Sequence, residues 1–227
     1  MPSNRFAEAK KLVDKSKVYS IPEGVALAKK TATAKYDEAI ELHVRLGIDA
    51  SKSDQQVRGT IALPHGTGKT KIVVAFVEGD KEAEAKAAGA DIVGGEELIN
   101  KIAQTSQINF DVAVATPVMM SKLAKVARLL GPRGLMPNPK TDTVSPNVTK
   151  KIQEQKAGKE SFKNDNTGNI HQVFGRKSFS EVQLEANLRA LMDQIKKLKP
   201  SASKGIYVRN ASISSTIGPG IKIDASS

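Results

Sequence analysis

The chain has 227 residues, 39% of them hydrophobic, which is enough to bury a core in either one large domain or two small domains. Lysine and arginine outnumber aspartate and glutamate by 35 to 24, and the net charge of +11 indicates a polyanionic partner, above all nucleic acid, with a basic soluble enzyme as the alternative. The absence of cysteine excludes disulfides and thiolate sites, and the lack of an apolar N-terminal segment or a run of about 18 apolar residues predicts a cytosolic protein without a membrane span.

Two strands are predicted in the first flank of the chain. Hydrophobic and polar residues alternate over residues 37–48, which predicts a strand with one buried face. The polar face of this strand carries Glu41, His43 and Arg45, which indicates a solvated surface, although a histidine there could also contact a ligand. Residues 57–63 predict a second strand.

Short strands and helices alternate through the middle of the chain. The apolar runs predict strands, and the segments with helical spacing predict helices, the last of them ended by Gly131 and Pro132. In chain order these are strand 72–77, helix 80–88, strand 92–93, a helix through 102, strand 111–115 and helix 119–130. This alternation predicts a Rossmann-like, three-layer α/β/α unit.

The last third of the chain predicts a hairpin, a helix and a strand. Residues 162–175 have the pattern of a hairpin, with a turn made by Asp165, Asn166, Thr167 and Gly168. Leucine and isoleucine recur at alternating spacings of four and three over residues 181–199, which predicts a helix with one core face, stopped by a proline. Residues 204–214 predict another strand.

The two flanks are expected to form one domain. Neither flank has enough elements to close a layered core, whereas the two together make one α/β domain with the central unit inserted. We therefore predict an α/β protein of two domains, in which residues 1–66 and 159–227 form domain I and residues 67–158 form domain II. Glycines at both crossings predict a hinge at Gly66, Gly68 and Gly158.

Residues 131–144, with the sequence GPRGLMPNPKTDTV, must form a shaped loop. Three prolines fix φ and remove backbone donors, and the two glycines permit φ values that other residues avoid. Arg133 and Lys140 place two cations on this stiffened backbone, which suits docking against an anionic surface. A well-packed surface connection between two elements explains the same residues equally well.

Two further patterns are weak as indicators of catalysis. The segment GTGKT, residues 66–70, resembles the end of a phosphate-binding loop, but the full motif needs glycine where Leu63 stands and should open a helix. A flexible linker is therefore favoured over nucleotide binding. The three histidines, His43, His65 and His171, have no spacing typical of metal ligands.

Small polar residues gather in two turns. The 165–168 turn offers amides, hydroxyls and a nearby lysine, and residues 212–220, with the sequence SISSTIGPG, combine short hydroxyls with glycines. Such groups can hydrogen-bond phosphate, ribose hydroxyls and base edges, but they are also ordinary turn chemistry. Only 4% of the residues are aromatic, which argues against a binder that stacks successive bases on aromatic side chains.

Several of these segments together resemble one family. The block ARLLGPRGLMPNPK (residues 127–140), with LGIDA (46–50), KSDQQVRGT (52–60), LPHG (63–66) and SSTIGP (214–219), closely resembles the bacterial-type ribosomal protein L1 family, over nearly the whole chain. The resemblance implies two α/β domains with the second inserted in the first. It also implies a non-catalytic, cofactor-free and metal-free protein, a monomer within the cytoplasmic ribosome and without membrane contact. Its implied partners are large-subunit rRNA at the mobile stalk, exit-site tRNA and its own mRNA, whose translation many members repress.

The resemblance also implies which residues contact rRNA. They come from the domain built from both chain ends: Lys35, Tyr36, Glu41, Lys163, Asp165, Thr167, Gly168, His171, Ser215, Thr216, Ile217 and Gly218. Tyr36, Ala39 and Ile217 depart from the residues usual in the family. Two other classes of function stay open, namely a phosphate-handling enzyme that uses residues 66–70 and an RNA-binding regulator that acts outside the ribosome.

Overall fold

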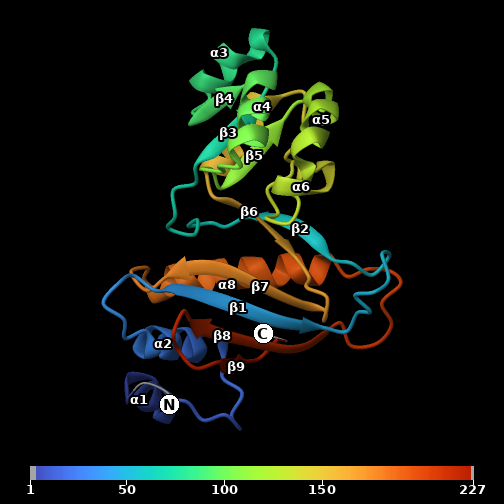
Figure 1. Cartoon of the computed structure of the whole chain (residues 1–227). Helices are drawn as coiled ribbons and strands as arrows, with labels where there is room; N and C mark the ends of the chain where they lie inside the picture. Colours follow the sequence, from blue (N-terminus) through green and yellow to red (C-terminus); the bar gives the residue numbers. More distant parts are fainter. Residues whose placement is uncertain (1–3, 226–227) are drawn as a thin grey trace. The chain divides into compact units, whose positions relative to one another are not determined.

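The computed structural model describes residues 4–225, which fall into two compact units (Figure 1). Unit 1 contains the chain up to Gly68 and from Ser161 onward, and unit 2 contains Lys69–Glu160. Both units combine helices with sheets, so the α/β fold class predicted from the sequence is confirmed. Among the described residues, no helix is both long and apolar enough to cross a membrane.

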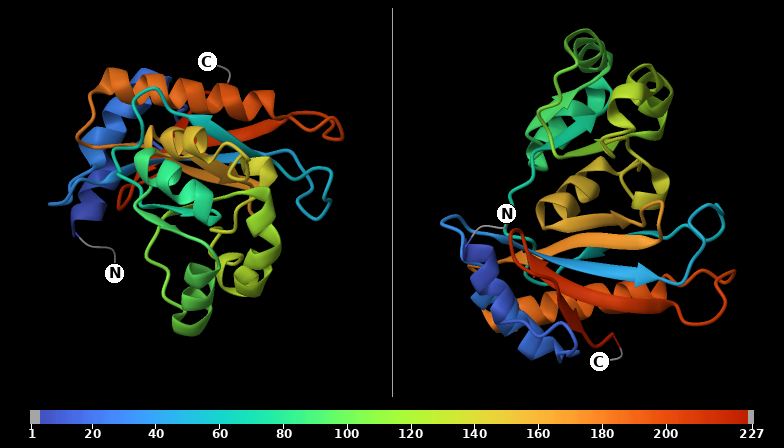
Figure 2. Two further views of the ribbon diagram at one scale, coloured as in Figure 1. Left: turned by 90° about the horizontal axis from the view of Figure 1, so that it is seen from above. Right: turned by 60° about the horizontal axis from the view of Figure 1, so that its bottom comes forward.

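Unit 1 is built on a four-stranded antiparallel sheet in the order β7-β1-β8-β9, to which both halves of the chain contribute (Figure 2). The strands are β1 (Ala39–Leu46), β7 (Asn169–Arg176), β8 (Val208–Ser215) and β9 (Ile221–Ile223). The predicted alternation in β1 is confirmed, because the side chains of Ile40, Leu42, Val44 and Leu46 are buried. They form one core with the apolar faces of α2 (Ile21–Thr31) and α8 (Glu181–Lys197), which pack on this side of the sheet.

Helix α8 follows closely from its sequence. Ser180 and Gln183 form a capping box, in which the serine hydroxyl accepts from the Gln183 backbone and the glutamine side chain accepts from the Ser180 N–H. The predicted core face is buried along the helix, at Leu184, Leu188, Leu191 and Ile195. Unit 1 also contains α1 (Asn4–Lys11), and a separate two-stranded sheet is formed by β2 (Arg58–Ala62) and β6 (Lys159–Lys163).

The predicted hairpin over residues 162–175 is wrong in its strand pairing. The turn forms where expected, but β6 pairs with β2 while β7 joins β1 in the larger sheet. Asn164 explains the separation, because its side-chain oxygen accepts from the Val57 N–H at 2.7 Å and its own N–H donates to the Val57 carbonyl at 3.0 Å. Within the described residues, one isolated bridge between Asn164 and Ile170 is what remains of the expected ladder.

Unit 2 is a three-stranded parallel sheet between two layers of helices, as predicted (Figure 1). Its strands are β3 (Val73–Phe76), β4 (Ile92–Gly94) and β5 (Val112–Ala115), with β3 in the centre. Val73 and Ala75 pack with α3 (Gly79–Ala87) and α7 (Val148–Lys156). Val74 and Phe76 face the opposite layer, which contains α4 (Glu96–Thr105) and α5 (Pro117–Leu123).

The predicted helix over residues 119–130 is wrong in its continuity. It is divided into α5, the 3-10 turn η1 (Ala124–Val126) and α6 (Ala127–Leu130), because the backbone of Val126 leaves the helical region at φ −107° and ψ 6°. Its apolar spacing was nevertheless correct, since Met119, Leu123, Val126 and Leu130 are all buried in one cluster. The apolar spacing therefore predicted the buried face of this segment correctly, but it could not reveal the break in the backbone.

The proline-rich loop 131–144 is anchored at both ends. Leu135 and Met136 pack against the core cluster of unit 2, and Gly134 adopts φ +71°. After η2 (Pro139–Thr141), the loop returns to the sheet, where the Ala115 N–H donates to the Thr143 carbonyl. The loop is thus a packed connection, which was one of its two predicted interpretations. Arg133 is exposed, and the side chain of Lys140 lies outside the described residues.

Candidate nucleic-acid interface

The face of the β7-β1-β8 sheet opposite the apolar core is lined by polar side chains. Cross-strand register places His43 between His171 and Ser212, and it places Glu41 beside Ser214. Since side chains alternate along a strand, these residues share one face. We call this surface the polar sheet face and define it by Glu41, His43, Arg45, His171, Ser212 and Ser214.

Residues from three parts of the chain meet where β1 begins, in a group that we call the strand-end cluster (residues 35–38, 176–178 and 215–218). Glu38 organises it: its side chain is 1% exposed, and its carboxylate accepts from the Ala34 N–H at 2.6 Å and from the Ile217 N–H at 3.3 Å. The Thr216 hydroxyl accepts from the Ala39 N–H at 3.1 Å. These bonds fix the 215–218 turn against the start of β1.

Small size is required at Gly218. A Cβ there would lie 2.4 Å from the Ser215 hydroxyl oxygen and 3.3 Å from that of Thr31. The outer side of the cluster is apolar as well as cationic, because Tyr36 is 52% exposed and Ile217 is 41% exposed beside the exposed Lys35. An exposed aromatic ring next to a cation can stack on an unpaired base, which is how proteins bind single-stranded parts of folded RNA.

The turn between β6 and β7 is held by one carboxylate. Asp165 accepts from the N–H groups of Thr167 at 2.9 Å and Asn169 at 2.7 Å, and also from the Thr167 hydroxyl. Desolvation raises the pKa of Asp165, but the hydrogen bonds from Asn169 and Thr167 outweigh it and hold the pKa well below its usual value. Gly168 takes φ +81°, and its carbonyl accepts from the Leu46 N–H. Asp165 therefore remains charged and keeps the turn rigid.

The polar sheet face joins the turn to the strand-end cluster. The turn adjoins the end of β1 and the cluster adjoins its start, so the eight residues of β1 separate them by about 25 Å. Eleven of the twelve residues expected to contact rRNA therefore lie along one sheet, at its two ends and on its polar face, and Lys163 ends β6 of the two-stranded sheet, just before the turn. Arg133 and Lys140, expected as secondary contacts, belong to unit 2.

The expected hinge glycines differ in their local structure. Gly66 and Gly68 adopt φ values of +63° and +73° in the first crossing. The buried side chain of Asn187 ties this crossing to unit 1, because it accepts from the His65 N–H at 3.0 Å and donates to the Gly66 carbonyl at 2.8 Å. Gly158 has φ +94° and terminates α7, with its N–H bonded to Gln155, which is the ordinary role of a glycine after a helix.

The 66–70 segment lacks the structure of a phosphate-binding loop. It precedes the strand β3, whereas the motif needs a helix whose first N–H groups face the phosphate. Lys69, the residue that would reach the phosphate, bonds Asp111 instead, with 2.6 Å between Nζ and Oδ1. The preference for a linker over a nucleotide site is supported by this geometry.

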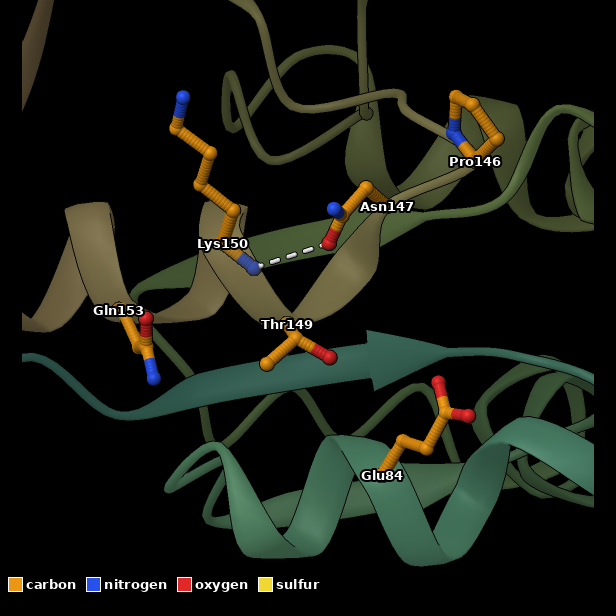
Figure 3. A pocket seen from close by; sticks show the side chains of 6 residues that line it. All are labelled: Glu84, Pro146, Asn147, Thr149, Lys150 and Gln153. Atoms are coloured by element: carbon orange, nitrogen blue, oxygen red, sulfur yellow. Dashed lines mark hydrogen bonds between the residues drawn. The ribbon is translucent and has the colours of Figure 1, made fainter.

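A cavity of about 560 Å³ lies in unit 2 near the start of α7, and it is lined by Glu84, Pro146, Asn147, Thr149, Lys150 and Gln153 (Figure 3). The amide group of Asn147 already has a structural role, because it caps α7 by accepting from the Lys150 N–H at 3.3 Å. The Lys150 side chain extends away from the other lining residues (Figure 3). No residue expected from the sequence to bind RNA lines this cavity.

Comparison with known proteins decides the family. Residues 28–219 match the model of the Ribosomal protein L1p/L10e family, which is most of the chain. The chain belongs to this family. It is also 52% identical over 222 residues to the large ribosomal subunit protein uL1 of Kosmotoga olearia, and the alignment covers 98% of this chain and 96% of that relative.

Membership of the L1p/L10e family confirms the resemblance read from the sequence. The chain is therefore a ribosomal protein of the cytoplasm, in a family whose general properties are a structural role and rRNA binding.

Sequence reasoning missed Glu38 and gave His43 only a minor role. Glu38 lies just before a predicted strand, and its burial depends on the distant 215–218 turn that it binds. His43 and His171 are 128 positions apart, yet their Nδ1 atoms lie 2.8 Å from each other. The register of β1 against β7 brings them together, and the strict alternation in β1 was the one signal that pointed to this face.

Proposed function

We propose that this ribosomal protein is a structural constituent of the large subunit that binds large-subunit rRNA through unit 1. The binding surface consists of the strand-end cluster, the polar sheet face and the 163–169 turn. One observation carries the proposal: segments from three distant parts of the sequence meet along one sheet, whose face opposite the core carries polar side chains. The uL1 relative is named for the large ribosomal subunit, which supports the same partner.

The chemistry of this surface suits folded RNA. Hydroxyls, amides and carboxylates can bond ribose hydroxyls and base edges, and Tyr36 offers a face for stacking. The cations of this surface are Lys35, Arg176 and Lys177 in the strand-end cluster, Arg45 on the polar sheet face and Lys163 before the turn. We therefore expect affinity to combine recognition of RNA shape with a moderate dependence on salt.

The proposal is tested by Thr216→Val, which keeps the size of the side chain and removes its hydroxyl. We expect binding to an rRNA fragment that contains the stalk to weaken by about 1–3 kcal/mol, because a polar contact in the interface is lost and its partners are left unpaired. Filter binding or fluorescence anisotropy at fixed salt measures the change. Thr216→Ser, which keeps the hydroxyl, should bind much more like the parent chain.

A matched control lies in unit 2. The Thr105 hydroxyl also bonds a backbone carbonyl, that of Lys101 at 2.8 Å, so Thr105→Val removes a comparable group far from the proposed surface in sequence and in another unit. Unchanged affinity in Thr216→Val, with the fold intact, would remove the strand-end cluster from the interface. Equal losses in both valine variants would point to a general effect on stability.

The finer roles follow from the family resemblance. We propose that the protein binds the rRNA of the mobile stalk, assists the movement and release of exit-site tRNA, and represses translation of its own mRNA. The two crossings between the units would act as the hinge of this movement. The exposed Arg133 would provide a second RNA contact or a contact on domain closure, and Lys140 is proposed for the same role.

An RNA-binding regulator outside the ribosome remains the second candidate, since the same surface would bind a free RNA that resembles the rRNA site. Sedimentation of the tagged protein through a sucrose gradient separates the two. We expect it to travel with large subunits and 70S-type particles, whereas a free regulator would stay at the top of the gradient.

A further inference from the structure

Two histidines form a closely coupled pair at the centre of the polar sheet face. The Nδ1 atoms of His43 and His171 are 2.8 Å apart, and the two rings are tilted by 59°. The distance is that of a hydrogen bond between ring nitrogens, so one Nδ1 must carry a proton and the other must accept it.

The neighbours of the pair determine which ring donates. The carboxylate of Asp165 faces His171 Nε2 at 3.6 Å, and a carboxylate favours an N–H on that nitrogen. A neutral His171 then has a bare Nδ1, which accepts from the Nδ1–H of His43. His43 Nε2 is left to accept from the Ser214 hydroxyl, 3.0 Å away. With both rings neutral, every position of this chain of hydrogen bonds is filled.

The pair has room for one added proton and no more. A proton on His43 Nε2 is accommodated when the Ser214 hydroxyl rotates from donor to acceptor. A second proton would have to occupy His171 Nδ1, where it would point at the Nδ1–H of His43 across 2.8 Å. The pair therefore holds either no added proton or one.

The surroundings of His43 favour its neutral form in the free protein. Burial and the neighbouring His171 lower the pKa of His43, and Glu41, with its carboxylate 4.0 Å from Nε2, opposes them only in part. The other charged groups from adjoining elements are Arg45 on β1, Lys222 on β9, Lys163 before the turn, and Asp165.

We propose that RNA binding drives the uptake of one proton by the His43–His171 pair, so that the two rings act as a proton-linked anion contact. This inference rests on the proposed function, because it needs phosphate groups to dock on the polar sheet face. A docked phosphate favours the charged form of the pair, because the opposite charges attract each other. Affinity then rises as the pH falls, and by linkage the gain is at most about tenfold per pH unit because one proton is bound.

The experiment measures binding of the full chain to a stalk-containing rRNA fragment at constant ionic strength, at steps from about pH 6 to 8. Calorimetry in buffers of different ionisation enthalpy counts the protons taken up directly. His43→Gln and His171→Gln retain hydrogen-bonding groups without titrating in this range. His65→Gln is the matched control, because its exposed side chain lies in the first crossing, away from the pair.

We expect the parent chain and His65→Gln to take up a measurable amount of proton, up to one per complex, and to bind several-fold more tightly near pH 6 than near pH 8. The dependence of affinity on pH should become weaker in His43→Gln and His171→Gln. Because all the proteins are measured on the same RNA, titration of the RNA itself contributes equally to each and cancels in the comparison. Circular dichroism checks folding at each pH. If His43→Gln does not fold, because His43 is half-buried, His171→Gln alone tests the proposed proton uptake.

Equal pH slopes in the parent chain and the His171→Gln variant, or uptake of more than one proton through the pair, would overturn the inference. The proposed function fails in a different way, as absence of specific binding at every pH.

Discussion

Gly218→Ala tests the packing of the 215–218 turn most sharply. The added methyl would lie 2.4 Å from the Ser215 hydroxyl oxygen, well inside contact distance, and 3.3 Å from that of Thr31. The turn or the serine must shift to accommodate it. Overpacking of this kind costs about 1–3 kcal/mol of unfolding free energy. A displaced turn should also weaken rRNA binding, because Thr216 and Ile217 belong to it.

The same geometry predicts rescue by a second substitution. The Ser215 hydroxyl is buried, with no hydrogen-bond partner within the part of the chain that the structure describes, so Ser215→Ala should change stability by less than about 1 kcal/mol. Without that hydroxyl, the nearest Ser215 atom is its Cβ at 3.5 Å, an ordinary contact. The double variant should therefore recover most of the loss, with a coupling energy of about 1–2 kcal/mol.

Urea unfolding of the four proteins in this cycle gives the coupling energy, provided that the m-value is unchanged. Binding of the rRNA fragment by the same four proteins shows whether the turn recovers its function along with its stability. A Gly218→Ala protein as stable as the parent, or a double variant as unstable as the Gly218→Ala single variant, would refute the proposed clash between the added methyl group and the Ser215 hydroxyl.

Two further predictions concern buried or charged groups that fix loops of unit 1. Asn187→Ala should lower the unfolding free energy by about 2–4 kcal/mol, since it orphans the His65 N–H and the carbonyls of Gly66 and Phe174, and hydrogen exchange at His65 should accelerate. Asp165→Asn should destabilise the chain at neutral pH, because the folded-state pKa of Asp165 is lowered. That contribution is present above the ordinary carboxyl pKa of about 4 and is lost as the pH falls below it, so urea unfolding should show the parent and variant converging in acid.

Periodicity was sufficient to predict the elements whose environment is uniform along their length. The alternation in β1, the apolar strands of unit 2 and the core face of α8 each repeat one pattern over several residues, and each is buried as expected. The three-residue strand β9 was missed because it is too short to show a period. The break at Val126 left the apolar spacing intact and was therefore equally invisible.

The contacts of the candidate site could not be predicted from the sequence, because they join residues that are far apart in the chain. The family resemblance gave the residues along the sheet, but the contacts that position them depend on partners far away in sequence. Glu38 is bound to a turn about 180 positions later, and Asn164 draws β6 toward β2 and away from β7. The histidine pair depends on strand register, and a slip of one residue would place His43 in the core.

The central claim, that unit 1 binds large-subunit rRNA along this sheet, is tested most directly by crosslinking the protein to RNA in cells and identifying both the nucleotides and the residues. We predict crosslinks from residues 35–41, 163–171 and 212–218 to one compact site in large-subunit rRNA. Crosslinks to that rRNA confined to unit 2, with these three segments unlinked, would contradict the account.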